Sequence, residues 1–352
     1  MKANGFSAAN FLFLVMLFQE AITNGSSALE YQKRMATPGV GPVGTRSSFS
    51  NNINTCHFNS WPQNVLNGQV SCSHQQLCYG GYGTAGQERA LFAVCYNTAK
   101  RIPEFTGHIL NSGGVTKAPQ KILTNPGDEN KKWTSDATLA PNNVATTGDY
   151  SGKQAISNYN SVYNRILARG HLSPAGDFAK DNSEFYVTYT TTNCAPQWQP
   201  FNGGNWNNLE TAIRNFSKTN RSTLYIFTGT GGKALVNGLE FRLKGSVLTP
   251  KYYWKAVCDP EAPGITPGTT GQSIVFVAEN KPGDISEKKV EGNCPGVTKQ
   301  QTEKFGVINC YSRTEAATSF PEIAGNLPPF GSLCDPDIRG TFLDTDLQNK
   351  LQ

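Results

Sequence analysis

Six polar residues between positions 169 and 214 are of the types that could hydrolyse a phosphodiester bond. In chain order they are Arg169, His171, Asn193, Asn202, Glu210 and Arg214. Such hydrolysis requires a base to activate water, a cation to neutralise charge on the phosphate, and a group that protonates the leaving oxygen. His171 suits the first task, because a neutral imidazole accepts a proton near pH 7.

The amides and the carboxylate of this set suit a hydrated magnesium ion. Mg²⁺ prefers oxygen ligands and keeps several of its waters, so it needs few protein ligands. Asn202 could be such a ligand, and Glu210 could hold the waters of the ion. Arg169 or Arg214 could grip phosphate oxygens or orient the carboxylate.

Each of these residues also has a plainer interpretation. Glu210 and Arg214 could form an ordinary i,i+4 surface pair on a helix. Asn202 could be a turn residue in "FNGG", and Asn193 could satisfy backbone groups at a strand end. His171, in the polar break "RGHLSPAGD", could be a loop histidine without a task.

Two glycine-rich motifs resemble nucleotide-binding loops but have the wrong surroundings. "GYGTAG" (81–86) has the spacing G-x-G-x-x-G, yet the preceding "SHQQLCYG" is not a buried strand. "GTGG" (229–232) lacks the following Lys-Ser/Thr of a phosphate loop and reads as a turn that ends a strand.

A helix over 205–220 positions part of the polar set. Trp206, Leu209, Ile213 and Phe216 follow at spacings of three and four, which places them on one apolar stripe. Glu210 belongs to a second, polar row on the same helix, together with Asn207 and Arg214.

Apolar and β-branched runs predict strands around this helix. The runs are 90–96, 184–189, 223–229, 252–257 and 273–279. With turn signals between them and at least one clear helix, they indicate an α+β class with a mainly antiparallel sheet.

The N-terminus and the cysteines indicate a secreted protein. Lys2 precedes the apolar run Phe11 to Phe18, which is too short to span a bilayer and resembles a cleaved signal peptide, with cleavage between Ala21 and Ala28. No other stretch is long enough to span a membrane, so we expect a soluble mature protein.

All nine cysteines follow this segment, and in an oxidising compartment they are expected to form disulfides. They fall into an N-terminal four, a C-terminal four and Cys194 between them, so Cys194 is the candidate for the unpaired residue. The net charge of +5 favours polyanions, and Asn215 and Asn220 begin glycosylation sequons.

The sequence around the polar set resembles the DNA/RNA non-specific endonuclease family. "ARGHLSPAGDF" is followed by "NCAPQWQPFNGGNWNNLE", which gives the spacing N-x(8)-N-x(7)-E-x(3)-R through Asn193, Asn202, Glu210 and Arg214. Residues 92–110 resemble the first hairpin of animal relatives. The resemblance implies a ββα-metal finger on a central, mainly antiparallel six-stranded sheet flanked by helices, with disulfide bonds.

The resemblance also implies a role for each site residue. His171 would be the general base, Asn202 the direct side-chain ligand of a hydrated Mg²⁺ (Mn²⁺ being an alternative), and Glu210 a hydrogen-bond partner of the ion's waters. Asn193 would bind phosphate or position the base, and Arg214 would anchor the side of the site that carries Glu210. A water on the metal would protonate the 3′-oxygen and leave 5′-phosphate ends.

Two departures from the family pattern concern charge near the histidine. Ala168 replaces a common aspartate, as it does in other animal relatives. Bacterial members place an arginine shortly before an upstream tryptophan, whereas "NKKW" offers Lys131 or Lys132 before Trp133. Lysine supplies charge without the bidentate fork, so weaker activity or compensation by Arg169 is expected.

We therefore expect a signal peptide over 1–26, a cysteine-containing segment over 27–88 and a nuclease domain over 89–340. The protein would be a secreted, Mg²⁺-dependent endonuclease whose partners are DNA and RNA, with no membrane partner, and a homodimer is among its expected states. The alternatives are a secreted nucleic-acid-binding protein with this fold and little catalysis, and a disulfide-rich interaction protein that does not bind nucleic acid.

Overall fold

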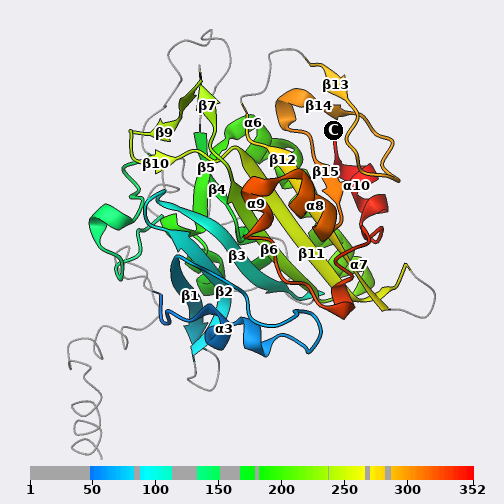
Figure 1. The fold of residues 1–352 in the computed structure, drawn as a ribbon, viewed down its shortest axis with the longest axis horizontal. Coiled ribbons are helices and arrows are strands. Elements are labelled where there is room, and N and C mark those ends of the chain that lie inside the picture. Colours follow the sequence, from blue (N-terminus) through cyan, green and yellow to red (C-terminus); the bar gives the residue numbers. More distant parts are fainter. Residues whose placement is uncertain are drawn as a thin grey trace, which may run out of the picture. The chain divides into compact units, whose positions relative to one another are not determined.

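An antiparallel sheet of seven strands forms the centre of the fold (Figure 1). Its order is β1-β2-β3-β6-β11-β12-β15. The strands are β1 (Gln75–Tyr82), β2 (Glu88–Asn97), β3 (Ile102–Leu110), β6 (Leu224–Gly231), β11 (Tyr252–Pro263), β12 (Thr270–Glu279) and β15 (Asn309–Tyr311). The predicted α+β class and antiparallel sheet are confirmed, but the expected number of six strands is wrong.

The computed structural model describes residues 48–82, 88–112, 133–150, 167–178, 182–236, 238–265, 270–281 and 287–352. All of them belong to one unit that spans Val43–Gln352. The expected signal peptide and the two lysines of "NKKW" lie outside the described residues. Among the helices that are described, none is long and apolar enough to cross a membrane.

Strand β1 overturns the expectation that "SHQQLCYG" is not a buried strand, because Leu77, Cys78 and Tyr79 are buried in it. The sequence signal is weak here because "QQLCYGGY" lacks β-branched residues. Pairing with β2 and the disulfide between Cys56 and Cys78 hold it at the edge of the sheet. The expected boundary after residue 88 falls at the start of β2, the strand that pairs with β1. The hairpin expected over 92–110 is present as β2 and β3.

Four further strand pairs lie outside the central sheet. They are β4 (Leu167–His171) with β5 (Cys194–Trp198), β7 (Leu235–Val236) with β8 (Leu239–Glu240), β9 (Arg242–Leu243) with β10 (Val247–Leu248), and β13 (Lys289–Val290) with β14 (Gln301–Thr302). The first pair presents the histidine of the polar set.

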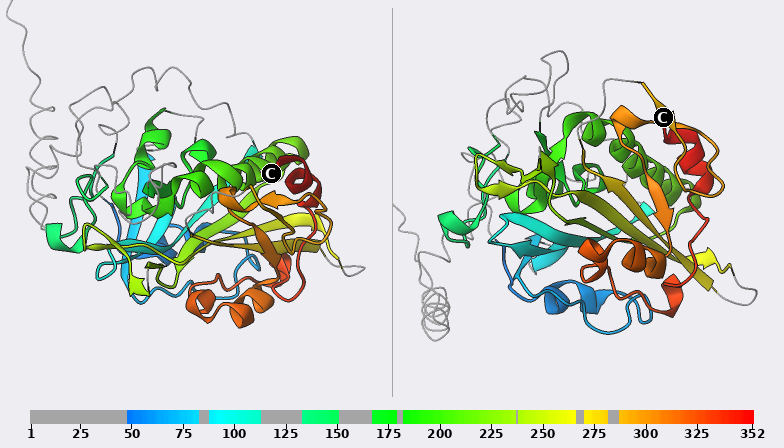
Figure 2. Two further views of the ribbon diagram at one scale, coloured as in Figure 1. Left: turned by 90° about the horizontal axis from the view of Figure 1, so that it is seen from above. Right: turned by 45° about the horizontal axis from the view of Figure 1, so that its top comes forward.

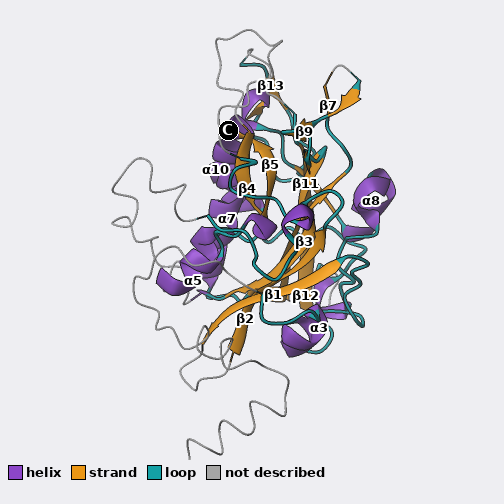
Figure 3. Ribbon diagram, turned by 90° about the vertical axis from the view of Figure 1, so that its left-hand side faces the viewer, coloured by secondary structure: helices purple, strands orange, loops and turns teal. Residues whose placement is uncertain are grey.

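Helices cover both faces of the sheet (Figures 2 and 3). One face carries α7 (Asn207–Asn220) and α10 (Asp344–Lys350), and the other carries α3 (Ile53–Cys56), α8 (Arg313–Ser319) and α9 (Pro321–Ala324). The remaining helices are α5 (Asn182–Val187), α6 (Gln199–Phe201) and the π-helix η7 (Asn202–Trp206). Short 3-10 turns are η1 (Phe58–Ser60), η4 (Pro141–Asn143), η5 (Ala175–Phe178), η6 (Thr191–Asn193), η8 (Glu303–Phe305) and η9 (Ser332–Cys334).

The helix predicted over 205–220 is confirmed as the end of η7 followed by α7. All four residues of its apolar stripe are buried in the core between this helix and the sheet: Trp206, Leu209, Ile213 and Phe216. The two sequons lie on the same helix, where Asn215 is half-buried and Asn220 is exposed.

The strand predicted over 184–189 is wrong, because this segment contains α5. Its side chains pack in two directions, which a half-buried helix allows. Phe185 contacts the ring of Tyr189 at 5.2 Å, whereas Val187 packs on the cluster formed by β1 and β2. Tertiary packing here overrides the β propensity of "EFYVTY".

The disulfides follow the predicted grouping. Cys56–Cys78 and Cys72–Cys95 close within the N-terminal four, and Cys258–Cys334 and Cys294–Cys310 within the C-terminal four. Cys194 is free and buried, as expected. The turn expected at "GTGG" is mostly strand: Gly229, Thr230 and Gly231 belong to β6, and only Gly232, with a φ of +62°, lies beyond its end.

Candidate active site

The short hairpin of β4 and β5 presents Arg169 and His171. The two strands are antiparallel, and His171 lies opposite Cys194. Gly170 separates the two candidate site residues because nothing larger fits between them: a β-carbon there would lie 2.8 Å from the Tyr253 hydroxyl and would also collide with Gln197. The "RGH" pattern thus reflects close packing of the hairpin.

The His171 imidazole lies between two aromatic rings. Its centroid is 4.6 Å from the Trp133 ring and 4.9 Å from the Tyr189 ring. Its Nε2 atom is buried and accepts or donates no hydrogen bond within the described part of the chain. Burial and the Arg169 charge lower the pKa of His171 to about 3, so the ring is neutral at neutral pH.

Arg169 packs against the same aromatic wall. Its guanidinium carbon is 5.5 Å from the centre of the Trp133 ring and 5.7 Å from that of Tyr150, within cation–π range. One Nη atom also donates to the Thr147 carbonyl at 3.4 Å. Trp133 therefore lies beside both Arg169 and His171. It is the tryptophan before which bacterial members of the family place an arginine.

Asn193 is fully buried and uses its amide internally. Both hydrogens of Nδ2 are donated at 2.9 Å, one to the Ser173 carbonyl and one to the Thr188 carbonyl. Its Oδ1 accepts from the Ser173 amide, and its own carbonyl accepts from the Leu172 amide, both at 2.9 Å. Asn193 therefore clamps the two residues that follow His171, and no amide hydrogen is left for a phosphate oxygen.

Asn202 begins the π-helix that leads into α7 and is half-buried. The turn departs from helical geometry at Gly204, where φ is −95° and ψ is −120°. A β-carbon at Gly204 would lie 2.7 Å from the Phe305 Cβ, so the close approach requires glycine. The "NGG" sequence therefore shapes the entrance of the helical run that carries Glu210, about two turns further on.

Glu210 and Arg214 lie one turn apart on α7 and contact each other loosely. The distance from Arg214 Nη1 to Glu210 Oε2 is 3.9 Å, and the Glu210 side chain is 13% exposed. Burial raises the pKa of Glu210 to about 7, although the charges of Lys255 and Arg214 act in the opposite direction. Glu210 is thus a carboxylate whose ionisation falls near neutral pH.

The structure adds two partners that the sequence reasoning missed, Asp177 and His108. Asp177 Oδ1 accepts from Arg214 Nη1 at 2.9 Å, and its Oδ2 is 2.9 Å from His108 Nε2. Burial alone would raise the pKa of Asp177, but the His108 hydrogen bond and the Arg214 charge outweigh it and hold that pKa below its usual value. Burial lowers the pKa of His108, so a neutral ring donates to Asp177 through Nε2–H.

Lys255 is the third group that sequence reasoning missed. It lies in the middle of β11 and is buried, with Nζ 2.5 Å from Thr228 Oγ1 and 5.6 Å from the centre of the Trp206 ring. Burial lowers its pKa, and the nearby Glu210 and Asp177 oppose that shift. A lysine within the otherwise apolar "YYWKAV", and an aspartate six residues after His171, were the available signals.

The atoms that this set offers as metal ligands are oxygens, which magnesium prefers. Asn202 offers an amide oxygen at the start of η7, and Glu210 offers a carboxylate on α7, which directly follows η7. The free thiol of Cys194 is buried and directed to the Thr191 carbonyl, so it adds no soft ligand. Within the described residues no group of three or more His, Cys, Asp and Glu is arranged to hold a metal. A mostly hydrated ion with one or two oxygen ligands fits this set.

Comparison with known proteins adds the family. A family model described as DNA/RNA non-specific endonuclease matches residues 73–311. The chain belongs to this family. The match begins within the cysteine-containing segment and includes all six residues of the polar set.

Several members of the family are similar in sequence. The salivary endonuclease of Lutzomyia longipalpis is 26% identical over 231 residues, which cover 61% of this chain and 51% of that protein. A nuclease of Nostoc sp. is 31% identical over 195 residues (55% and 61%), and nuclease C1 of Cunninghamella echinulata is 28% identical over 200 (54% and 71%). The chain thus spans between half and two thirds of the first two relatives.

A solved structure of the EndoG/EndoGI complex also aligns with the chain. It is 17% identical and covers 67% of this chain and 82% of the other, with a TM-score of 0.41.

Proposed function

We propose that this protein is a secreted, Mg²⁺-dependent endonuclease that hydrolyses phosphodiester bonds of both DNA and RNA. The observation that carries the proposal is the buried, unpartnered Nε2 of His171 in a ring that is neutral at neutral pH. Family membership and the oxygen donors on η7 and α7 support it. In this proposal β4, β5 and α7 form the ββα-metal finger.

His171 acts as the general base. Its neutral ring takes a proton from water as the water oxygen attacks phosphorus, and the bond from phosphorus to the 3′-oxygen breaks. The products are a 5′-phosphate and a 3′-hydroxyl. Because water is the nucleophile, the reaction does not use a 2′-hydroxyl, and DNA and RNA are both substrates. The rings of Trp133 and Tyr189 hold the imidazole in place.

Asn202 and Glu210 would hold a magnesium ion, Asn202 as the direct ligand and Glu210 through the waters of the ion. When bound, hydrated Mg²⁺ neutralises charge on the phosphate and supplies the proton for the 3′-oxygen. Mn²⁺ meets the same oxygen preference and is expected to substitute.

The remaining residues position these groups or bind phosphate. Asn193 fixes the segment after His171, which favours the positioning role over phosphate binding. Arg214 anchors the α7 side of the site. Arg169 supplies the positive charge that an arginine before the tryptophan gives in bacterial members, and its proximity to Trp133 supports this role.

Secretion is supported by the four disulfides, since such bonds persist in oxidising compartments. A homodimer and glycans at Asn215 and Asn220 remain predictions. The division into a signal peptide (1–26), a cysteine-containing segment (27–88) and a nuclease domain (89–340) is likewise a proposal.

A plasmid-nicking assay with and without EDTA tests the function. Wild-type protein with MgCl₂ is expected to nick supercoiled DNA and to degrade RNA, and EDTA to abolish both. His171→Ala should lower turnover by at least ~10²-fold with unchanged DNA binding, and Asn202→Ala should raise the Mg²⁺ requirement.

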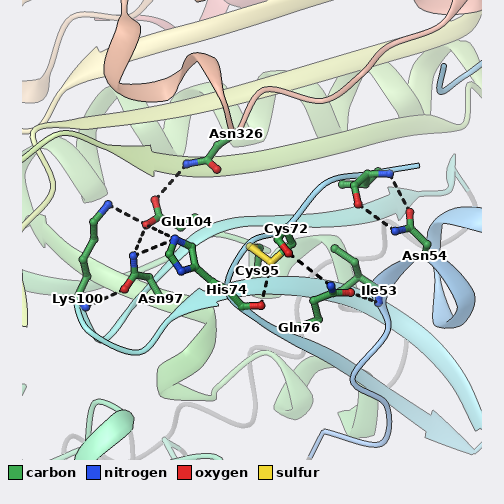
Figure 4. The surroundings of a disulfide bond; sticks show 11 residues. Ile53, Asn54, Cys72, His74, Gln76, Cys95, Asn97, Lys100, Glu104 and Asn326 are labelled. Carbon is green, nitrogen blue, oxygen red and sulfur yellow. Dashed lines mark hydrogen bonds and ion pairs between the residues drawn. A yellow bond between two sulfur atoms is a disulfide. The ribbon is translucent and has the colours of Figure 1, made fainter. Parts of the chain in front are cut away.

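His74→Ala provides the matched control, because His74 is a half-exposed histidine that contacts Asn97 and Glu104 instead of the site residues (Figure 4). It is expected to nick at the wild-type rate. DNA binding without Mg²⁺-dependent cleavage by the wild type would favour the alternative of a binding protein with this fold. Near-normal cleavage by His171→Ala would refute the assignment of the base.

A further inference from the structure

Arg214 has two carboxylates within reach, and it bonds to only one of them. Its Nη1 donates to Asp177 at 2.9 Å, whereas Glu210 Oε2 is 3.9 Å away. The first distance is that of a strong charge-assisted hydrogen bond, and the second is too long for any hydrogen bond. Glu210 therefore keeps its acceptor positions, although it sits at the i,i+4 spacing at which glutamate and arginine on a helix ordinarily pair.

Three features direct Arg214 to Asp177. His108 Nε2, buried on β3, holds the second carboxylate oxygen of Asp177 at 2.9 Å. Gly176 leaves room for the guanidinium, since a β-carbon at this position would lie 2.9 Å from Arg214 Nη1. Thr211 Oγ1 accepts from Arg214 Nη2 at 3.2 Å. The arginine is thus held directly by η5 and by its own helix α7, while β3 holds its partner Asp177 through His108.

The same partners reach the segment that follows the histidine of the proposed site. His108 Nδ1 lies 3.4 Å from the Ser173 hydroxyl, which donates to Thr106 Oγ1 at 2.9 Å. Ser173 is the residue clamped by Asn193. Asp177 itself lies in η5, four residues beyond Ser173, and its side chain is 4% exposed. A buried path therefore joins the base segment on one side to Arg214 and α7 on the other.

We propose that Asp177 is a positioning residue that, held by His108, keeps Arg214 off Glu210, so that the Glu210 carboxylate is free to accept hydrogen bonds from the hydration shell of the magnesium ion. This inference rests on the proposed function. Without Asp177, Arg214 would close on Glu210 as an ordinary i,i+4 pair and compete with the ion.

Asp177→Asn tests this role, because it removes the charge that holds Arg214 and preserves the side-chain volume. We expect the MgCl₂ concentration for half-maximal nicking to rise by ~10-fold, the scale seen when a partner of a metal-site residue is removed. The KM for plasmid DNA should stay within about 2-fold of wild type, because Asp177 is buried and bonds to His108 and Arg214 inside the protein. MgCl₂ alone should also raise the Tm of the wild type at lower concentrations than that of the variant.

A double variant separates competition by Arg214 from simple damage to the fold. In Asp177→Asn/Arg214→Leu the competing cation is absent, so the Mg²⁺ dependence of Tm should return to within about 3-fold of wild type, even though turnover stays low. General disruption of the fold predicts the opposite, a double variant at least as impaired as the single one.

Gly176→Ala keeps the test decisive if Asp177→Asn does not fold. It leaves Asp177 intact and places a methyl group against Arg214 Nη1, so it too should raise the Mg²⁺ requirement. Glu104→Gln is the matched control. Glu104 is a buried carboxylate bonded to Lys100 at 2.8 Å and to Asn326 at 3.1 Å, neither of which belongs to α7 (Figure 4). Loss of the Glu104 charge should lower Tm and leave the Mg²⁺ requirement unchanged.

The outcomes distinguish a failure of the proposed function from a failure of the positioning role of Asp177. If wild-type protein shows no Mg²⁺-dependent cleavage, the proposed function fails. If wild type is Mg²⁺-dependent but the folded Asp177→Asn and Gly176→Ala variants have the wild-type Mg²⁺ requirement, the positioning role is overturned and the proposed function stands. An equal rise in Mg²⁺ requirement in Glu104→Gln would also overturn it, because any buried carboxylate would then suffice.

Discussion

The ionisation of Glu210 should give the enzyme an acidic limb in its pH profile near neutrality. With a pKa of about 7, the carboxylate is about 10% ionised at pH 6 and about 90% at pH 8. The ionised form accepts hydrogen bonds at both oxygens, whereas protonation turns one of them into a donor, which cannot pair with the donating waters of a cation. His171, with a pKa of about 3, stays neutral over this whole range and contributes no limb of its own. The rate should therefore rise by roughly 9-fold between pH 6 and pH 8.

The assay is the initial rate of plasmid nicking from pH 5.5 to pH 9 at MgCl₂ concentrations far below half-saturation. Under these conditions the rate reports the carboxylate before the ion binds. Raising MgCl₂ should move the midpoint to lower pH, because a bound cation favours the ionised form. Glu210→Gln should be slower at every pH and lack the limb between pH 6 and pH 8.

Two results would refute the reasoning. A flat wild-type profile between pH 6 and pH 8 would mean that burial does not raise the pKa of Glu210. A limb that persists in Glu210→Gln but disappears in a His171 variant would mean that the histidine, and not the carboxylate, titrates there.

Three further predictions concern stability. Gly170→Ala should destabilise the fold by about 1–3 kcal/mol in urea unfolding, because the added β-carbon overpacks against Gln197 and Tyr253. Gly325→Ala is the control, since its β-carbon would meet nothing within 4 Å. Equal stability of the two variants would contradict the packing explanation. Removal of the Cys258–Cys334 disulfide, which closes a sequence separation of 76, should lower the free energy of unfolding by about 4 kcal/mol. Removal of Cys294–Cys310, with a separation of 16, should lower it by about 3 kcal/mol. The reverse order of urea midpoints would contradict the explanation by loop entropy. The folded-state pKa of His171 lies below its unfolded value near 6.5, so the free energy of unfolding should fall as pH drops from about 6.5 toward about 3, by up to about 1.4 kcal/mol per pH unit. Urea unfolding of His171→Asn between pH 7 and pH 4.5 should show a shallower fall. An unchanged slope would mean that another group causes the acid sensitivity.

The sequence alone determined the features that depend on local pattern and on spacing. Period-3.6 apolar residues located α7, β-branched runs located four strands of the central sheet, and the order of the cysteines separated two disulfide groups from Cys194. The spacing of the six polar residues led to the endonuclease family, which the family match bears out. These features depend on residues close together in the chain or on a motif, so they can be read without a fold.

The features that the sequence did not reveal depend on contacts between distant segments. "EFYVTY" has strand propensity but contains α5, from which Phe185 packs on Tyr189 and Val187 on the cluster that β1 and β2 form. Strand β1 has weak propensity and exists because β2 and a disulfide hold it.

The electrostatics of the site depend most strongly on the tertiary structure. Asp177, His108 and Lys255 come from η5, β3 and β11, and nothing in their local sequence relates them to α7. Only the fold places Asp177 closer to Arg214 than Glu210 is, 2.9 Å against 3.9 Å. Sequence spacing predicted that Glu210 and Arg214 are neighbours. Which carboxylate the arginine binds depends on burial and on distances between segments, and a linear sequence contains neither.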